Sequence, residues 1–309
     1  MSLDPDVAQR VQSLTLSARR AVEGLLSGMH RSPHRGASVV FVEHREYRPG
    51  DDPRLLDWRA FARTDRDVIK RFEQETQLRA TLVLDRSGSM AYPKDGKRSK
   101  EGPANKHTHA ATLLSALAYV LIRQGDAAGA ALFTDEVGDV VPPRTRPAHL
   151  ETVLTALAQP PEPGAPTDLR AALYAVAERA GRRGVVAIAS DLIDLQEDAL
   201  APIAHLVSRG HEVILFHVLH PDEIDLPFPG PTRFLGCEGE DAIDADADAV
   251  RRSYKREIEA FIDTSRRRAV AAGARYTLAR TDGRPEQQLS EVLAAGRRAT
   301  GSTGSPGSR

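Results

Sequence analysis

From Arg79 onward, short apolar runs alternate with amphipathic segments, and this alternation limits the possible folds more than any other feature of the chain. Strands are expected at Thr81–Leu84, Ala128–Phe133, Gly184–Ala189, Glu212–Val218 and Arg275–Leu278. Strands that alternate with helices are joined by crossover connections, which favours a mostly parallel sheet. The sequence therefore predicts an α/β domain with a doubly wound, mostly parallel sheet flanked by helices.

The segments between these runs repeat apolar residues at intervals of three and four, which is the spacing of an amphipathic helix. Helices are expected at Asn105–Arg123, Ala148–Leu157, Asp168–Ala180, Asp198–Val207, Asp246–Ala272 and Pro285–Arg298. The Gly- and Ser-rich tail that follows cannot bury apolar surface, so residues 299–309 are expected to be disordered.

The first 78 residues have a different pattern and are expected to form a separate subdomain, ahead of a domain at residues 79–298. One helix and two strands are expected there, at Asp6–Leu26, Ser38–Val42 and Asp67–Glu75. An Arg- and Asp-rich block extends from Arg45 to Arg66 and contains Trp58. This block either stabilises the small sheet through salt bridges or forms a docking surface, and the sequence leaves both interpretations open.

The charge balance limits the classes of partner. Lys and Arg number 42 and Asp and Glu 43, for a formal net charge of -1, so no bulk field favours nucleic acid or a membrane surface. Cys237 is the only cysteine, which excludes an intramolecular disulfide and a Cys-based zinc site. The longest apolar stretch, Ala110–Ile122, is shorter than the roughly 18 residues that a membrane span needs. We therefore expect a cytoplasmic protein that binds no nucleic acid and has no membrane span.

The clearest chemical signal follows the first strand of the α/β pattern, in the sequence Asp85-Arg86-Ser87-Gly88-Ser89. Ligands of open parallel sheets bind at the carboxyl ends of the strands. A carboxylate and two hydroxyls are hard oxygen donors of the kind that Mg²⁺ or Mn²⁺ prefers. Thr167, just before a helix, and Asp191, at the end of another apolar strand, can complete the set. Each also has an ordinary interpretation, since Thr167 or Asp168 can be a helix N-cap and Asp191 a turn residue.

Two blocks of the sequence resemble known families. Asp85-x-Ser87-x-Ser89, followed by Thr167 and Asp191, resembles the metal-ion-dependent adhesion site of von Willebrand factor A-like domains. The resemblance covers roughly Arg79 to Asp282. The preceding block, Arg45-Glu46-Tyr47-Arg48-Pro49-Gly50-Asp51-Asp52 with Asp57-Trp58, resembles the bacterial domain of unknown function family 58. Together they imply a von Willebrand factor A-like fold behind an N-terminal helix and small sheet.

The resemblance implies a non-enzymatic module in which Asp85, Ser87 and Ser89 coordinate Mg²⁺ or Mn²⁺ directly. Thr167 and Asp191 are implied to coordinate the ion directly or through water. A partner protein is implied to supply an Asp or Glu to an open coordination position. Because the family is commonly encoded beside MoxR-type AAA+ ATPases, such an ATPase is the implied partner. Integrin-type relatives often have Gly after the final Asp, whereas Leu192-Ile193-Asp194 follows here, so Asp194 competes with Asp191 as a ligand.

Two other functions remain open from the sequence. The same ion can serve a metal-dependent hydrolase of phosphoesters, with Asp191 or Asp194 as the base. No His or Lys is linked to the site by a motif, which argues against this hypothesis. Alternatively, the site is vestigial and the protein is a scaffold.

Two charged segments flank the predicted site in the sequence. The basic segment from Tyr92 to His109 contains Lys106 and is expected either to border a carboxylate-bearing partner or to be a solvated loop. The acidic segment from Glu238 to Asp248 does not have the spacing of a calcium loop. Its acids are therefore expected to be solvated charges at the start of a helix.

Overall fold

The protein is described by a computed structural model, which covers residues 5–28, 41–46, 68–72, 78–93, 104–181, 183–193 and 198–300. The chain divides into two compact units, Met1–Arg31 with Leu78–Arg309, and Ser32–Gln77. The smaller unit contains an antiparallel pair, β1 (Phe41–Glu46) and β2 (Val68–Phe72). The first of these strands continues four residues beyond the expected Ser38–Val42. Residues 38–40, 67 and 73–75 of the expected strands lie outside the described residues.

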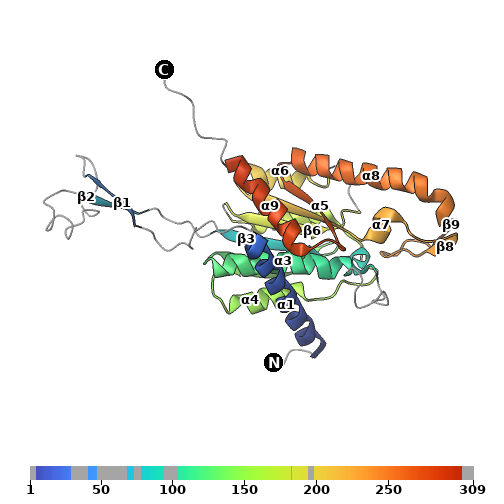
Figure 1. Ribbon diagram of the computed structural model, residues 1–309, viewed down its shortest axis with the longest axis horizontal. Coiled ribbons are helices and arrows are strands. Elements are labelled where there is room, and N and C mark those ends of the chain that lie inside the picture. Colours follow the sequence, from blue (N-terminus) through green and yellow to red (C-terminus); the bar gives the residue numbers. More distant parts are fainter. Residues whose placement is uncertain are drawn as a thin grey trace, which may run out of the picture. The chain divides into compact units, whose positions relative to one another are not determined.

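The larger unit is built on a six-stranded sheet with the order β10-β7-β6-β3-β4-β5 (Figure 1). Its strands are β3 (Arg79–Asp85), β4 (Ala127–Phe133), β5 (Val137–Arg144), β6 (Val185–Ser190), β7 (Glu212–Leu219) and β10 (Arg275–Arg280). Neighbouring strands are parallel, with one antiparallel pair, β4 and β5. The chain moves outward from β3 in both directions, so the expected doubly wound, mostly parallel sheet flanked by helices is confirmed.

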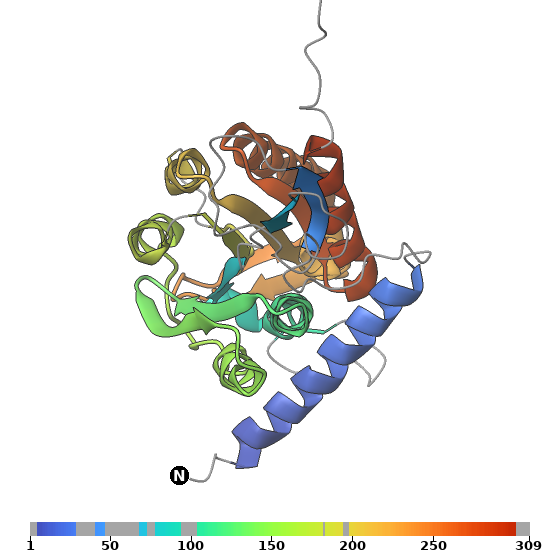
Figure 2. The ribbon, with the colours of Figure 1, turned by 90° about the vertical axis from the view of Figure 1, so that its left-hand side faces the viewer.

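Helices cover both faces of this sheet (Figure 2). One side has α1 (Pro5–Gly28), α3 (Lys106–Arg123), α4 (His149–Leu157) and α9 (Pro285–Thr300), and the other has α5 (Leu169–Arg179), α6 (Ala201–Ser208) and α8 (Ala247–Ala271). Successive residues of a strand enter different cores. Leu82 and Leu84 pack in the first, and Val83 packs in the second. Burial on both sides thus explains the uninterrupted apolar runs of the sequence.

Helix α1 belongs to the larger unit, although the sequence grouped it with the small N-terminal sheet. It contacts α3, α4 and α9, and its apolar stripe is buried at Leu14, Ala18, Ala21 and Val22. An amphipathic helix needs an extended apolar surface to cover its stripe, and the α3–α9 layer supplies it. The smaller unit ends at Gln77, and the larger unit, which includes this helix, resumes at Leu78. Helix α9 runs to Thr300, and residues 301–309 of the expected tail lie outside the described residues.

Several short elements were not expected from the sequence. They are β5, the helices η2 (Gly88–Ala91) and α7 (Pro221–Asp225), and the hairpin of β8 (Pro231–Phe234) and β9 (Ile243–Asp246). Strand β5 contains Pro142 and Pro143, which obscure a strand pattern. Proline is tolerated there because β5 is an edge strand, with one side of its backbone free of ladder hydrogen bonds.

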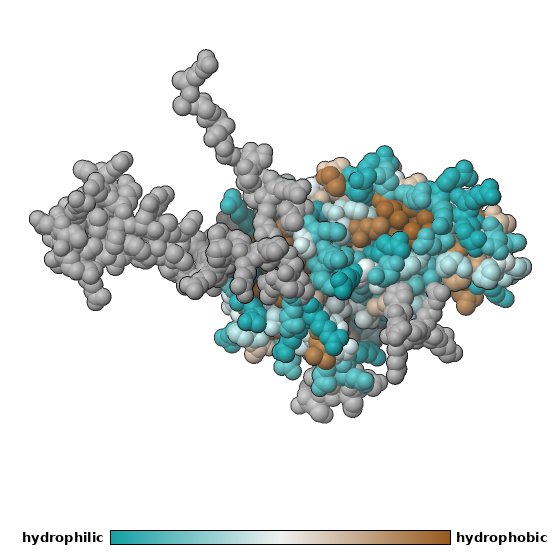
Figure 3. All heavy atoms as spheres, viewed as in Figure 1, coloured by the Kyte–Doolittle hydropathy of each residue, from teal (hydrophilic) through white to brown (hydrophobic). Residues whose placement is uncertain are grey.

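On the face seen in Figure 3, small apolar patches interrupt the polar side chains. No helix within the described ranges is both long and apolar enough to cross a membrane.

Candidate metal centre

The loop after β3 brings three of the predicted ligands together. Asp85 ends β3, Ser87 follows in the loop, and Ser89 lies in η2. The backbone N–H of Ser87 donates to Asp85 Oδ1 at 2.9 Å, and the Oγ atoms of Ser87 and Ser89 are 3.0 Å apart. All three side chains are buried. The loop therefore collects one carboxylate and two hydroxyls at the carboxyl end of an interior strand.

Gly88 allows this loop to approach two other segments closely. Its N–H donates to the carbonyl oxygen of Ala165 at 3.0 Å. A Cβ atom at this position would clash with the carbonyl oxygen of Cys237 and would lie 2.8 Å from the backbone nitrogen of Gly164. Since both obstacles are backbone atoms, only glycine fits between the two serines without moving a loop.

Strand β6, which neighbours β3, contributes the second carboxylate. Asp191 follows the last residue of β6, is fully buried and accepts a hydrogen bond from Ser89. The preceding residue, Ser190, donates to Asp85 Oδ2 at 2.6 Å. Asp85, Ser87, Ser89 and Asp191 thus form one hydrogen-bonded group, which we call the oxygen cluster. The competing Asp194 lies outside the described residues.

The fifth predicted ligand, Thr167, has a different immediate partner. Its hydroxyl donates to Glu238 Oε1 at 3.2 Å, and its side chain is buried. Asp168, the next residue, is the N-cap of α5 and accepts from the Ala171 N–H at 2.8 Å. Asp168 therefore caps the helix, so the hydroxyl of Thr167 is not needed as the cap. Its loop reaches the oxygen cluster through the Gly88–Ala165 hydrogen bond.

Lys106 is a component of the site that the sequence did not indicate. This first residue of α3 is fully buried, with Nζ at 2.7 Å from Asp191 Oδ2 and 2.6 Å from Glu223 Oε1 on α7. Lys106 is therefore not a solvated residue of the basic segment but neutralises carboxylates of its own chain. Residues 94–103 of that segment lie outside the described residues. The one available signal was its position directly after the N-cap Asn105, where the helix dipole disfavours a cation.

The charges of the cluster shift its pKa values in opposite directions. Burial, reinforced by the charge of Asp191, raises the pKa of Asp85 to about 7. Burial also favours the neutral form of Asp191, but the ammonium of Lys106 outweighs it and holds the pKa of this carboxyl below its usual value. Burial lowers the pKa of Lys106, and the two carboxylates more than compensate, so the net shift is upward. Lys106 therefore neutralises Asp191, whereas Asp85 is a buried carboxylate served by hydrogen bonds alone.

The chemistry of these donors fits a small divalent cation. Carboxylate and hydroxyl oxygens are the donors that Mg²⁺ and Mn²⁺ prefer, and a second positive charge next to Asp85 would offset the burial of its carboxylate. Among the described residues, no group of three or more His, Cys, Asp or Glu side chains is arranged to hold a metal ion. A metal at this edge of the sheet must therefore use the serine and threonine hydroxyls together with the carboxylates.

The acidic segment beside the site is only partly as expected. Asp246 is the N-cap of α8 and accepts from the N–H groups of Asp248 and Ala249, which confirms that acids gather at the start of this helix. Glu238 instead pairs with Thr167. A further carboxylate thus lies next to the predicted ligands.

Comparison with known proteins identifies the family. Residues 43–262 match the family described as "Protein of unknown function DUF58". The chain belongs to the DUF58 family. A DUF58 relative, an uncharacterised protein of Mycobacterium tuberculosis strain H37Rv, is 30% identical over 229 residues, which cover 74% of this chain and 69% of that protein.

Two solved structures are also similar to this DUF58 chain. The conserved hypothetical protein BatB from Bacteroides thetaiotaomicron is 15% identical with a TM-score of 0.47, covering 72% of this chain and 99% of that one. The SpRpn10 VWA domain is 10% identical with a TM-score of 0.37, covering 71% of this chain and 95% of that one.

Proposed function

We propose that this DUF58 chain is a non-enzymatic module that binds another protein through a divalent metal ion. The oxygen cluster carries this proposal, because it gathers four buried oxygen-bearing side chains at the carboxyl edge of the sheet. Asp85, Ser87 and Ser89 would hold Mg²⁺ or Mn²⁺ directly, with Thr167 and Asp191 contributing directly or through water. The ion supplies positive charge and an open coordination position, which an Asp or Glu of the partner fills.

The charges around Asp191 argue against the hydrolase alternative that uses this residue as its base. A general base must accept a proton near neutral pH. Asp191 is poorly suited to this role because Lys106, at 2.7 Å, holds its pKa below the usual value. A bound carboxylate from a partner, in contrast, requires only a net positive ion. Turnover in a screen of phosphoesters with Mn²⁺ that is lost in Asp85→Ala would contradict the proposal.

Metal binding is tested by calorimetric titration of Mg²⁺ and Mn²⁺ into chelator-treated protein. We expect binding by the wild type that is lost in Asp85→Ala and Ser87→Ala. Ser115→Ala is the matched control, because Ser115 is also a fully buried serine but lies in the core on α3. Circular dichroism verifies that each variant is folded. A folded wild type that binds neither ion, or an Asp85→Ala variant that binds as well as the wild type, would contradict the proposed site.

We further propose that the partner is a MoxR-type AAA+ ATPase in the cytoplasm. Two arguments support this partner: the family that this sequence resembles is commonly encoded beside such ATPases, and the ion is predicted to prefer an acidic side chain. We expect the two purified proteins to co-elute in Mg²⁺ and to separate in chelator, with Asp85→Ala behaving like the chelated wild type. Co-elution that is unaffected by chelator would place the contact elsewhere on the chain.

A further inference from the structure

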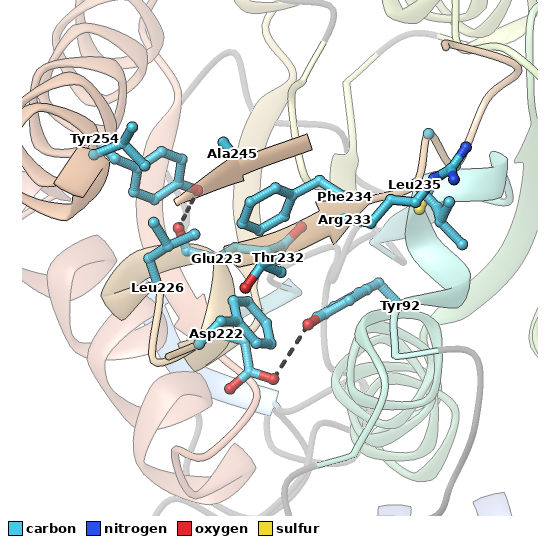
Figure 4. Close-up of a pocket in the computed structure, with 14 residues that line it drawn as sticks. Tyr92, Asp222, Glu223, Leu226, Thr232, Arg233, Phe234, Leu235, Ala245 and Tyr254 are labelled. Carbon is cyan, nitrogen blue, oxygen red and sulfur yellow. Dashed lines mark hydrogen bonds between the residues drawn. The ribbon is translucent and has the colours of Figure 1, made fainter. Parts of the chain in front are cut away.

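A mostly apolar pocket is drawn in Figure 4. Its volume is about 630 Å³, which is within the range of sites that enclose a large side chain or a small ligand. The wall comes from α7, the β8–β9 hairpin, the start of α8 and Tyr92. Its apolar part consists of Leu226, Phe228, Phe234, Leu235, Ala245 and Val250.

The polar groups of the pocket are already engaged with the protein. The Tyr92 hydroxyl donates to Asp222 Oδ2 at 3.2 Å, and the Tyr254 hydroxyl donates to the carbonyl oxygen of Glu223 at 2.5 Å, both drawn in Figure 4. The carboxylate of Glu223 accepts from Lys106, and the Thr232 hydroxyl donates to the carbonyl oxygen of Gly230 at 3.2 Å. Since these groups are satisfied internally, the pocket favours an apolar occupant over a highly polar one.

The pocket and the oxygen cluster share parts of their walls. Glu223 lines the pocket, and its carboxylate is paired with Lys106, which also contacts Asp191. Tyr92 directly follows η2, the element that carries Ser89. The carbonyl oxygen of Cys237, another lining residue, lies against Gly88. A polypeptide that reaches an ion held by the cluster therefore passes next to this pocket.

The rim of the pocket has an exposed arginine, paired with an aspartate, and an exposed large apolar side chain. Arg233 has a side chain 68% exposed, and its guanidinium is 3.9 Å from Asp244, at the limit of an ion pair. The acids Asp222 and Glu223 are neutralised or hydrogen-bonded from within the protein. Leu235, on the same rim, is 73% exposed and offers apolar contact area. The rim therefore matches a large apolar side chain, whereas selection of an acidic neighbour rests on the metal ion of the proposed function.

We propose that the pocket receives an apolar or aromatic side chain of the same partner segment whose carboxylate reaches the metal ion. This inference rests on the proposed function and adds a second anchor to it. The metal ion selects an acidic residue, and the pocket selects its neighbour. The occupant is therefore an acidic peptide segment of another protein with one large apolar side chain close to its Asp or Glu.

The test uses acetylated and amidated peptides that contain one Asp and one Phe separated by one, two or three Gly residues. Affinity for the full chain is measured by ligand-observed NMR in Mg²⁺. Matched peptides replace Phe with Gly or Asp with Asn. We expect the best Phe peptide to bind at least about tenfold more tightly than its Gly counterpart, because burial of a phenyl ring supplies this much affinity.

Two variants and one control test whether the advantage of Phe over Gly arises in the pocket. Leu235→Ser removes an exposed apolar side chain from the rim of the pocket, and we expect it to lose most of the advantage of Phe over Gly. Val270→Ser is the matched control, because Val270 is 59% exposed but lies on α8 outside the pocket lining. We expect it to retain the full advantage. Ala245→Trp, which fills the pocket from β9, should abolish the advantage as well.

The outcomes separate this inference from the proposed function. Equal binding of the Phe and Gly peptides, with both dependent on Asp and on Mg²⁺, would overturn the pocket proposal and leave the metal-dependent function intact. Phe-dependent binding that is lost in Leu235→Ser but is indifferent to Mg²⁺ and to Asp→Asn would show an apolar site that works without the metal. It would overturn the metal-dependent function and, with it, the proposal that one segment uses both anchors. Absence of binding by every peptide would overturn both.

Discussion

The ammonium group of Lys106 is placed between two carboxylates from distant parts of the chain. Asp191 lies 85 residues away in sequence and Glu223 lies 117 residues away, yet both accept from the same nitrogen within 2.7 Å. A buried ion of this kind is tolerated only when its charge is compensated. Lys106 therefore balances the negative charge of the oxygen cluster, and a metal ion must share Asp191 with it.

This arrangement makes the stability of a Lys106→Met variant dependent on metal. Removing the ammonium leaves Asp191 and Glu223 buried without a cation, so we expect the free energy of unfolding in chelator to fall by about 3 kcal/mol. We expect Mg²⁺ to restore part of this loss, because the ion can replace the missing charge next to Asp191. Urea denaturation with and without Mg²⁺ measures both effects.

Lys255→Met is the matched control for this prediction. Lys255 also pairs with a carboxylate, Asp225 at 3.3 Å, but its side chain is 43% exposed. Its loss is expected to change stability by less than about 1 kcal/mol, independently of Mg²⁺. A Lys106→Met variant whose stability does not respond to Mg²⁺ would show that no ion occupies the neighbourhood of Asp191.

At the scale of the elements, the loop between β3 and η2 depends on its close contact with two other loops. In Gly88→Ala, the added methyl group would clash with the carbonyl oxygen of Cys237, so the loop has to move away. We expect a loss of stability of about 2 kcal/mol and weaker Mg²⁺ binding, because the shift also displaces Ser87 and Ser89. Thermal denaturation and calorimetric titration measure the two effects.

Gly138→Ala is the control for this substitution. A Cβ atom at Gly138 would meet one atom, the carbonyl oxygen of Leu132, at an ordinary distance of 3.8 Å. The Mg²⁺ affinity of Gly138→Ala is expected to equal that of the wild type. Wild-type Mg²⁺ binding by Gly88→Ala would mean that the close approach of the loops is not needed for the site.

Helix α1 gains its stability from packing against α3, α4 and α9. Leu14 is 6% exposed and Leu16, two residues later, is 56% exposed. We expect Leu14→Ala to lower the free energy of unfolding by about 2 to 3 kcal/mol and Leu16→Ala to change it by less than about 0.5 kcal/mol. Urea denaturation of the two variants makes the comparison, and equal small effects would show that α1 is not part of the folded core.

At the scale of the whole molecule, stability is expected to depend on pH through buried histidine. His107 is buried in the first turn of α3, where burial, followed by the charges of Arg86 and Arg10, lowers its pKa to about 4. The unfolded chain therefore binds more protons than the folded chain between about pH 6.5 and 4. The stabilisation is fully present above pH 6.5 and is lost as the pH falls through this window.

Between pH 7.5 and pH 5, the preferential protonation of His107 in the unfolded chain lowers the free energy of unfolding by about 2 kcal/mol. The free energy of unfolding is measured by urea denaturation at pH 7.5 and pH 5. We expect its decrease between these pH values to be about 2 kcal/mol smaller in His107→Gln than in the wild type. His205→Gln, a change at an exposed histidine, is expected to retain the wild-type loss. An unchanged pH dependence in His107→Gln would mean that His107 is protonated in the folded chain at pH 5.

The local pattern of the sequence was sufficient for the parallel core strands and the long helices. It was also sufficient for the loop that carries Asp85, Ser87 and Ser89, because an uninterrupted apolar run marks the buried strand that this loop directly follows. The local pattern did not predict β5, whose prolines are tolerated only in an edge strand. It also grouped α1 with the small N-terminal sheet. In both cases the deciding neighbour is a distant segment, which no local pattern specifies.

The sequence alone determined the α/β class, the family and the oxygen donors at the end of β3. Only the tertiary structure decided that Lys106 neutralises Asp191 and Glu223, that Thr167 meets Glu238, and that a pocket lies beside the cluster. The physical reason is that burial requires apolar residues at regular positions within each helix or strand, and these positions can be read from consecutive residues. A pairing of side chains across 85 or 117 residues depends instead on strand order and helix packing.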